Sequence, residues 1–208
     1  MAFEKRVTLA LTGASGAQYA FRLLECLVAA DYQVMFLISR AAQVVVATET
    51  GVALPGQAGE METFLTEKYQ AKAGQIKVFG REQWMAPVAS GSGAPSTMII
   101  CPCSTGCLSA VATGASNNLI ERAADVALKE RRQLIMVPRE APYSEIHLEH
   151  MLKLTRMGVT IVPASPGFYN NPQTINDLID FIVARILNQM GVDHQLMPRW
   201  GDEFIEPV

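Results

Sequence analysis

Residues 5–30 read KRVTLALTGASGAQYAFRLLECLVAA, and this stretch decides the expected fold. Lys5–Leu11 is an apolar run that includes β-branched residues, which is typical of a buried strand. Thr12–Gly16 (TGASG) is a turn with two glycines, and Ala17–Ala30 has apolar residues at helical spacing. A strand, a loop and a helix in this order open a β–loop–α unit. Because the amide groups and partial positive charge of the helix N-terminus face the loop, we expect an anionic ligand there.

Apolar runs and helical segments alternate along the rest of the chain. Further strands are predicted at 33–38, 76–79, 97–101, 133–137 and 159–162, and further helices at 40–50, 61–70, 108–114, 118–132, 144–157 and 174–190. This alternation indicates a mostly parallel sheet with helices on both faces. The sequence therefore predicts an α/β protein with a single Rossmann-like (flavodoxin-like) domain over residues 1–208, including a C-terminal tail from about residue 191.

The composition restricts the class of protein and its partners. The 208 residues are enough for one core, 50% of them are apolar and 18% are charged. The net charge of -3 and the lack of a Lys/Arg block give no sign of a nucleic-acid partner. No apolar run approaches the roughly 20 residues that span a bilayer, and the first residues lack the apolar core of a signal peptide. We expect a cytoplasmic protein without a membrane span.

Unusual loops follow several of the predicted strands. In parallel α/β sheets, ligands bind beyond the carboxyl ends of the strands. At these ends the chain has TGASG (12–16), Ser39, CPCSTGC (101–107), PREAPYS (138–144) and PASPGFY (163–169). One pocket is expected to draw on all of them.

TGASG departs from the common nucleotide-binding loops. Gly13 and Gly16 are present, but the further glycines of a dinucleotide fingerprint are not. A Walker loop would need a Lys-Ser/Thr pair directly after Gly16, and that pair is not present either. NAD(P) and ATP are therefore disfavoured, whereas a single phosphate, as in FMN, needs fewer glycines. A second interpretation stays open, in which Ser15 is only the N-cap of the next helix.

Three of the four cysteines lie in CPCSTGC, which suggests a metal site at first sight. Structural zinc sites usually need two spaced pairs of ligands, and no second cysteine pair or nearby histidine is present. Pro102 and Gly106 indicate a turn instead, and the hydroxyl and amide groups after it favour a second contact to an anion or a ribityl chain. We expect reduced thiols and no metal.

Arg122 and Lys129 are seven positions apart, so they lie on the same face of the predicted helix 118–132. One interpretation is a clamp for a phosphate. The other is a set of ordinary salt bridges, because Asp125 is three residues from Arg122 and four from Lys129. The spacing alone favours the salt bridges.

Charged residues also stand at or near strand ends. Arg139 and Glu140 directly follow a strand, which favours a functional role. Glu49, within VVVATETGVAL, is either a helix-surface residue or a carboxylate whose pKa is raised by burial. Tyr169 follows a Pro-Gly turn. Arg185, within FIVARIL, is either a surface residue or an inward anion ligand.

These blocks together resemble the UbiX family of flavin prenyltransferases. The resemblance is carried by TGASGAQYA (12–20), ASGS (89–92), CPCSTGCLSAVATGASNNLIERAADVALKERR (101–132), PREAPYS (138–144) and PASPGFYNNP (163–172), in the family's order over nearly the whole chain. The wider superfamily of FMN-binding cysteine decarboxylases is similar only in part. Their early catalytic histidine and their Asn-containing PxMNxxMW-type segment are not seen here.

The resemblance implies a reaction and its partners. Members transfer a dimethylallyl group from dimethylallyl monophosphate to N5 and C6 of reduced FMN, closing a fourth ring without a metal. The product, prenylated FMN, is the cofactor of UbiD-type decarboxylases, one of which acts in ubiquinone biosynthesis. The family's assembly is typically a dodecamer with the site between subunits. The residue types do not distinguish a monophosphate from a diphosphate donor.

The resemblance also implies roles for residues at matching positions. Flavin contacts are implied for Gly13, Ala14, Ser15, Ser39, Ser90, Ser104, Thr105, Gly106, Cys107 and Arg139. Contacts to the prenyl phosphate are implied for Arg122, Lys129, Tyr169 and Arg185, some of them from neighbouring subunits. Trp84 and Trp200 are candidate aromatic walls that stabilise an allylic cation through their π faces.

The chemistry suggests work for two carboxyl groups. Departing phosphate builds negative charge on its oxygen, which Arg and Lys stabilise. An acid can protonate that phosphate, and a base must take the proton from flavin C6. We hypothesise that Glu49, beside Ser15, serves the flavin side and Glu140 the phosphate side. An FMN-dependent decarboxylase of a cysteine-like substrate and a non-catalytic FMN-binding protein remain alternatives.

Overall fold

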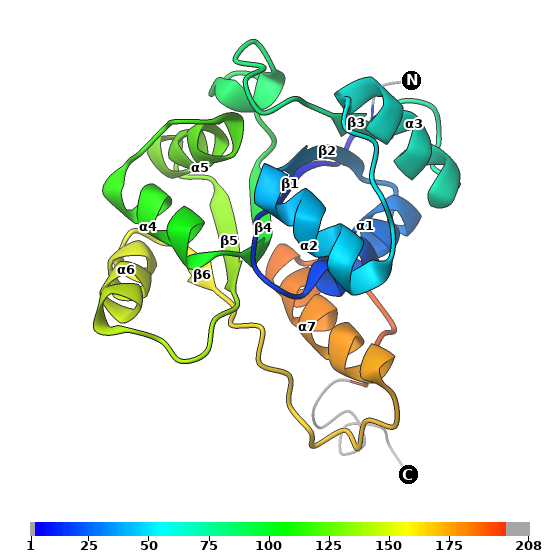
Figure 1. Ribbon diagram of the computed structural model, residues 1–208, viewed down its shortest axis with the longest axis vertical. Coiled ribbons are helices and arrows are strands. Elements are labelled where there is room, and N and C mark those ends of the chain that lie inside the picture. The colour runs from blue at the N-terminus through cyan, green and yellow to red at the C-terminus, as the bar shows by residue number, and fades with distance from the viewer. Residues whose placement is uncertain (1–2, 199–208) are drawn as a thin grey trace.

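The computed structural model describes residues 3–198 as a six-stranded parallel sheet with helices around it (Figure 1). The strands are β1 (Arg6–Leu11), β2 (Gln33–Ile38), β3 (Ile76–Val78), β4 (Thr97–Cys103), β5 (Gln133–Pro138) and β6 (Thr160–Ile161). The helices are α1 (Ala17–Ala29), α2 (Arg40–Thr50), α3 (Ala58–Lys68), α4 (Thr105–Thr113), α5 (Leu119–Lys129), α6 (Glu145–Arg156) and α7 (Ile175–Met190), with a short 3-10 helix η1 (Pro87–Ala89). Within the described residues no helix has the length and apolar character needed to cross a membrane.

The order of the strands is β3-β2-β1-β4-β5-β6, and every neighbouring pair is parallel. The chain winds outward from β1 to β3 and then returns to place β4 on the other side of β1. The boundary between β1 and β4 is therefore the point where the winding reverses. Doubly wound sheets bind their ligands in the crevice outside this point.

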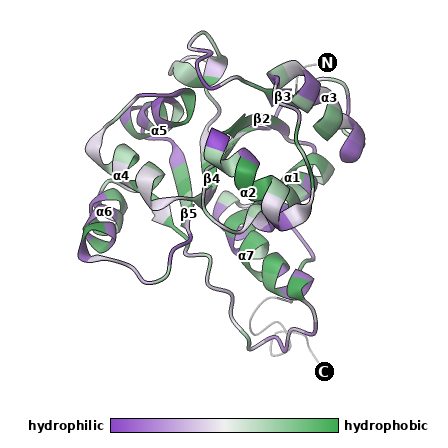
Figure 2. Ribbon diagram, viewed as in Figure 1, coloured by the Kyte–Doolittle hydropathy of each residue, from purple (hydrophilic) through white to green (hydrophobic). Residues whose placement is uncertain are grey.

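Alternate strand residues supply two separate cores. Leu9 and Ile99 belong to a core that includes α1 and α7, whereas Ala10 and Ile100 belong to one that includes α4 and α5. The strands are continuous apolar runs because both faces of the sheet are covered. Figure 2 shows the helices carrying both hydrophilic and hydrophobic residues, as expected when only one side of each helix is buried.

The predicted fold class is confirmed, and the predicted strands and helices are present with boundaries that differ by a few residues. The turn predicted at Pro102 and Gly106 is wrong. β4 continues through Pro102 to Cys103, with a register shift against β5 between Ile100 and Cys103, and Gly106 is the second residue of α4. A proline is tolerated here because it stands at an irregularity of the strand pairing, where its missing N–H interrupts no regular ladder.

Candidate functional site

The TGASG loop leads from β1 into α1 through two close approaches that require glycine. A Cβ atom on Gly13 would stand 2.5 Å from the Cβ of Ala41, so the loop lies against the first turn of α2. Gly16 has a φ of +108°, and a Cβ there would stand 2.7 Å from Cδ2 of Tyr19. Packing and backbone conformation therefore explain both glycines before any ligand is considered.

We expect Gly16→Ala to lower the free energy of unfolding by about 1–3 kcal/mol, because alanine is strained at this φ and its methyl group meets the Tyr19 ring. The matched control is Gly51→Ala. Gly51 also has a positive φ, +68°, but nothing lies within 4 Å of an added Cβ. Urea denaturation of the ligand-free protein measures both losses. Equal losses would show that the contact with Tyr19 contributes nothing.

A carboxylate of this chain occupies the N-terminus of α1. Oε2 of Glu49, near the end of α2, accepts hydrogen bonds from the backbone N–H groups of Gly16 (2.9 Å) and Ala17 (3.0 Å). The Ser15 hydroxyl donates to the same carboxylate. The N-cap residue of α1 is Gly16, which makes no side-chain cap hydrogen bond. The interpretation of Ser15 as the N-cap is therefore wrong, and the anion at this helix terminus is Glu49.

The surroundings of Glu49 keep its carboxyl group ionised. Burial raises its pKa, but the hydrogen bonds from Ser15, Gly16 and Ala17 and the charge of Arg139 together outweigh burial. The pKa of Glu49 therefore lies below its ordinary value of 4.5. The interpretation in which burial raises this pKa above the ordinary value is wrong. A carboxylate that is ionised at neutral pH is ready to accept a proton, as a general base must be.

The lowered pKa of Glu49 predicts a pH dependence of stability. Because the folded pKa is below the unfolded value of 4.5, ionised Glu49 stabilises the folded state above pH 4.5. This stabilisation is lost as the pH falls through the folded pKa. The melting temperature of ligand-free Glu49→Gln should therefore lie below that of the wild type near about pH 7 and approach it toward about pH 3. A difference that stays constant over this range would contradict the pKa shift.

Two further helix N-termini lie at the same edge of the sheet. The Ser39 hydroxyl caps α2 by accepting the N–H of Ala42 (3.1 Å), and the Ser104 hydroxyl caps α4 in the same way through Cys107 (3.3 Å). A Cβ on Gly106 would meet nothing within 4 Å, so the first turn of α4 faces open space. Because Glu49 already holds the N-terminus of α1, that of α4 is the better placed for an anionic ligand.

The loop after β5 brings a cation and a second carboxyl group to this edge. The N–H of Arg139 donates to the carbonyl of Cys103 (3.3 Å), which ties the loop to β4, and the charge of Arg139 acts on Glu49. Burial raises the pKa of the Tyr143 phenol, the Glu140 carboxylate raises it further, and Arg139 opposes both. Glu49, Arg139 and Glu140 thus lie along one edge of the sheet.

Tyr19 is a residue of this edge that sequence reasoning did not single out. Its half-buried ring lies over Gly16. Burial raises the pKa of its phenol, Cys101 raises it further, and the charge of Arg139 lowers it. The available signal was an aromatic residue three positions after Gly16, on the first turn of a helix that follows a ligand loop.

Ser90, Arg122 and Lys129 lie in a second place. Nε of Arg122 donates to the carbonyl group of the residue before Ser90 (3.2 Å), and its Nη1 pairs with Asp125 (2.8 Å). The predicted salt bridge between Arg122 and Asp125 is confirmed. The predicted one between Lys129 and Asp125 is wrong, because Nζ of Lys129 pairs with the neighbouring Glu130.

The position of α5 separates Lys129 from the TGASG loop. α5 ends at Lys129, four residues before β5 begins at Gln133. Lys129 therefore lies near the amino ends of the strands, whereas TGASG lies at their carboxyl ends.

Tyr169 and Arg185 lie in a third place. Tyr169 is 55% exposed and packs edge-to-face on Phe181 of α7, with ring centroids 5.5 Å apart. Arg185 is exposed one turn further along α7, beside Phe181. Because α7 and α5 cover opposite faces of the sheet, one chain does not bring the four predicted phosphate ligands together. Trp200 lies outside the described residues.

The cysteines are free thiols. Cys101 and Cys103 are buried in the two different cores, and Cys107 is half-buried on the first turn of α4. Burial raises the pKa of the Cys101 thiol. In residues 3–198 no group of three or more His, Cys, Asp or Glu side chains is arranged to hold a metal ion. Cys101 and Cys103 therefore belong to the packing beneath the site, whereas Cys107 lies at the N-terminus of α4.

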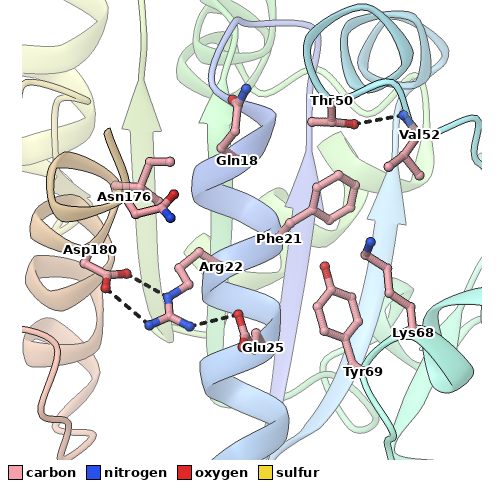
Figure 3. A pocket seen from close by; sticks show the side chains of 11 residues that line it. Gln18, Phe21, Arg22, Glu25, Thr50, Val52, Lys68, Tyr69, Asn176 and Asp180 are labelled. Atoms are coloured by element: carbon pink, nitrogen blue, oxygen red, sulfur yellow. Dashed lines mark hydrogen bonds and ion pairs between the residues drawn. The ribbon is translucent and has the colours of Figure 1, made fainter. Parts of the chain in front are cut away.

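A hollow of about 580 Å³ runs along the outer side of α1 (Figure 3). Its walls are Gln18, Phe21, Arg22, Glu25, Thr50, Val52, Lys68, Tyr69, Asn176, Ile179 and Asp180. Arg22 is held there by Asp180 (2.7 Å) and Glu25 (2.9 Å). Because two carboxylates balance its two cations, the hollow lacks the positive charge that binds phosphates. It touches the candidate site through Gln18, whose Nε2 donates to the Glu49 carbonyl at 3.5 Å.

Sequence comparisons identify relatives over the whole chain. A profile of the family described as Flavoprotein matches residues 1–187. The chain is 64% identical over 205 residues to the flavin prenyltransferase UbiX of Pseudomonas aeruginosa, covering 99% of this chain and 98% of the relative. It is 47% identical over 196 residues to the flavin prenyltransferase UbiX of Halalkalibacterium halodurans, covering 94% and 93%.

Solved structures agree with these relatives. A crystal structure of AnUbiX (PadA1) in complex with FMN and dimethylallyl pyrophosphate matches with a TM-score of 0.84 and 36% identity, over 94% of this chain and 97% of that one. A dodecameric FMN-dependent UbiX-like decarboxylase from Escherichia coli O157:H7 matches with a TM-score of 0.81 and 37% identity, over 94% and 98%. The FMN-dependent cysteine decarboxylase TvaF, at 16% identity and a TM-score of 0.56, shares the fold alone. The chain therefore belongs to the Flavoprotein family and, within it, to the UbiX flavin prenyltransferases.

Proposed function

We propose that this protein transfers the dimethylallyl group of dimethylallyl monophosphate to N5 and C6 of reduced FMN, forming prenylated FMN. The observation that carries the proposal is the 64% identity, over 99% of the chain, to a flavin prenyltransferase. The relative solved with FMN and dimethylallyl pyrophosphate supports both substrate classes. In this reaction the C–O bond of the donor breaks and phosphate leaves with the electron pair. One C–N and one C–C bond form, and N5 and C6 each lose a proton. One of these protons is taken up by a carbon of the former prenyl double bond and the other by the departing phosphate.

The carboxyl edge of the sheet fits an anionic flavin. The first turn of α4 meets open space at Gly106, and the positive charge of Arg139 acts on Glu49 at the same edge. Close approach of a flat ring is favoured by the small residues of the TGASG loop. The proposed flavin contacts at this edge are Gly13, Ala14, Ser15, Ser39, Ser104, Thr105, Gly106, Cys107 and Arg139. Ser90, which lies beside Arg122 in one chain, is proposed as a further flavin contact.

The prenyl phosphate is proposed to bind between subunits. Its four proposed ligands, Arg122, Lys129, Tyr169 and Arg185, lie on α5 or at α7, on opposite faces of the sheet in one chain. A homo-oligomer brings such separate groups to one point. The Escherichia coli relative is described as dodecameric, and we propose the same assembly here. The arginine and lysine side chains then stabilise the leaving phosphate, a role that a metal ion fills in other sites.

Two carboxyl groups are proposed to move protons. Glu49 is ionised, as a base that receives the proton from flavin C6 must be, and its hydrogen bonds from Gly16 and Ala17 hold the carboxylate in place. Glu140 stands beside Arg139 with one carboxylate oxygen accepting the N–H of Ala141 (3.0 Å), and we assign it to the phosphate side. Trp200, with Trp84, is proposed to line the prenyl group.

The product is proposed to serve as the cofactor of a UbiD-type decarboxylase, with a link to ubiquinone biosynthesis. We propose that the protein acts in the cytoplasm. The whole chain, residues 1–208, is proposed to act as one flavoprotein domain.

An anaerobic incubation separates this proposal from its alternatives. The protein is mixed either with reduced FMN and dimethylallyl monophosphate or with oxidised FMN and a cysteinyl substrate. A flavin with one added prenyl unit supports the prenyltransferase. Release of carbon dioxide from the cysteinyl substrate, with no prenylated flavin, would show that the protein is a decarboxylase instead. If neither prenylated flavin nor carbon dioxide forms, the protein is a non-catalytic FMN-binding protein.

A further inference from the structure

Thr12, directly after β1, is one of only three buried polar or charged residues in the described part of the chain. Thr12 is only 4% exposed. Its hydroxyl donates to the carbonyl of Pro102 (3.0 Å) and accepts the N–H of Ser104 (2.7 Å). Its own N–H also donates to Pro102 (3.2 Å), and its carbonyl accepts the N–H of Ala14 (2.8 Å). Both roles of the hydroxyl and both backbone groups are therefore in use.

These bonds join two loops of the candidate site. Thr12 begins the TGASG loop, and Pro102 and Ser104 belong to CPCSTGC, 90 or more positions away in the sequence. The two loops follow β1 and β4, the strands between which the winding of the sheet reverses. Thr12 therefore bridges the floor of the crevice where doubly wound sheets bind ligands.

We propose that Thr12 is a positioning residue for the flavin, one that holds the TGASG and CPCSTGC loops at the separation at which both contact the same flavin. This inference rests on the proposed function, since it assumes that both loops bind FMN. Thr12 itself is buried beneath the loops and acts through them. The bond to Ser104 fixes the N-cap of α4, and the bonds to Pro102 fix the end of β4.

The hydroxyl is the part of Thr12 that this role requires. Valine has nearly the same shape but neither donates nor accepts a hydrogen bond, so Thr12→Val leaves the Ser104 N–H without its acceptor. Chains whose loops have separated must realign before FMN binds both of them. If one chain in ten stays aligned, the apparent dissociation constant for FMN rises about tenfold. Saturating FMN selects the aligned state, so kcat is expected to change much less.

The test compares three variants of the full-length protein by titration with oxidised FMN and by anaerobic kinetics. Thr12→Val should raise the dissociation constant and the KM for FMN about tenfold, with kcat within about threefold of the wild type. Thr12→Ser, which keeps the hydroxyl, should restore the affinity. Thr8→Val is the matched control, because Thr8 is a 2% exposed threonine in the middle of β1, paired with Met35 and Met98 away from both loops. It should leave FMN affinity unchanged.

Wild-type affinity in a folded Thr12→Val would overturn the inference. An equal loss in Thr8→Val would overturn it too, because the effect would then follow from any hydroxyl lost from β1. If Thr12→Val fails to fold, hydrogen exchange of the Ser104 amide is measured in the wild type instead. Strong protection of this amide is expected. Exchange at the rate of an exposed amide would contradict its hydrogen bond to Thr12. A wild type that binds FMN through these loops but never prenylates it would sink the proposed function and leave this inference standing.

Discussion

Glu49→Gln is expected to lower the rate of prenyl transfer by about 10²- to 10⁴-fold while FMN remains bound, because the variant removes the proposed general base. Glutamine is nearly isosteric, and its side-chain oxygen can still accept the N–H groups of Gly16 and Ala17 that Glu49 accepts now. The architecture of the loop is therefore kept, and only the negative charge and the proton acceptor are lost. Single-turnover kinetics with reduced FMN bound beforehand measure the effect.

Glu25→Gln is the control for Glu49→Gln. Glu25 is a partly exposed carboxylate on α1 that pairs with Arg22 away from the strand ends, so its variant should keep the wild-type rate. Full turnover by Glu49→Gln with FMN bound would show that Glu49 is not the base. A lost rate accompanied by lost FMN binding would assign Glu49 to flavin binding instead.

Arg122→Ala is expected to lower kcat/KM for dimethylallyl monophosphate by about 10²- to 10³-fold, with FMN affinity unchanged. The reason is that a guanidinium group stabilises the negative charge that grows on the departing phosphate. In one chain Arg122 pairs with Asp125 and with the loop of Ser90, and it is about one third exposed. Its side chain is therefore accessible to the prenyl phosphate, whose binding site a neighbouring subunit is proposed to complete. Steady-state kinetics at saturating reduced FMN provide the measurement.

Asp125→Asn separates the two interpretations of Arg122. If the arginine serves only its salt bridge, Asp125→Asn and Arg122→Ala should have similar effects on stability and on rate. If Arg122 binds the prenyl phosphate, Asp125→Asn should keep most of the activity, since an exposed pair of this kind contributes about 0.2–1 kcal/mol to stability. Equal activity losses in the two variants would contradict a phosphate contact.

The sequence was sufficient for the fold and for placing the loops after the strands at one edge of the sheet, because both depend on local patterns. The β–loop–α unit at 5–30 and the alternation after it predict a parallel sheet, and its loops then fall at one edge. The rule that a strand ends at a proline is local as well, but it failed at Pro102, where β4 continues to Cys103. There the carbonyl group is held by Thr12, a contact between distant strands that a local pattern does not contain.

Other parts of the site depend on tertiary placement. Glu49 reaches the N-terminus of α1 from 33 positions away, and this contact reverses the pKa shift expected from burial alone. Helical spacing places Arg122 and Lys129 on one face of α5. It does not show that α5 and α7 cover opposite faces of the sheet. The separation of the predicted phosphate ligands therefore required the three-dimensional structure.

The most direct test of prenyl transfer is the structure of the flavin that the protein releases. Reduced FMN and dimethylallyl monophosphate are incubated anaerobically with the protein, and the flavin is analysed by mass spectrometry and NMR. We predict one added dimethylallyl unit, bonded to N5 and to C6, together with one phosphate for each flavin converted. Flavin recovered unchanged from folded, FMN-bound protein would contradict the account.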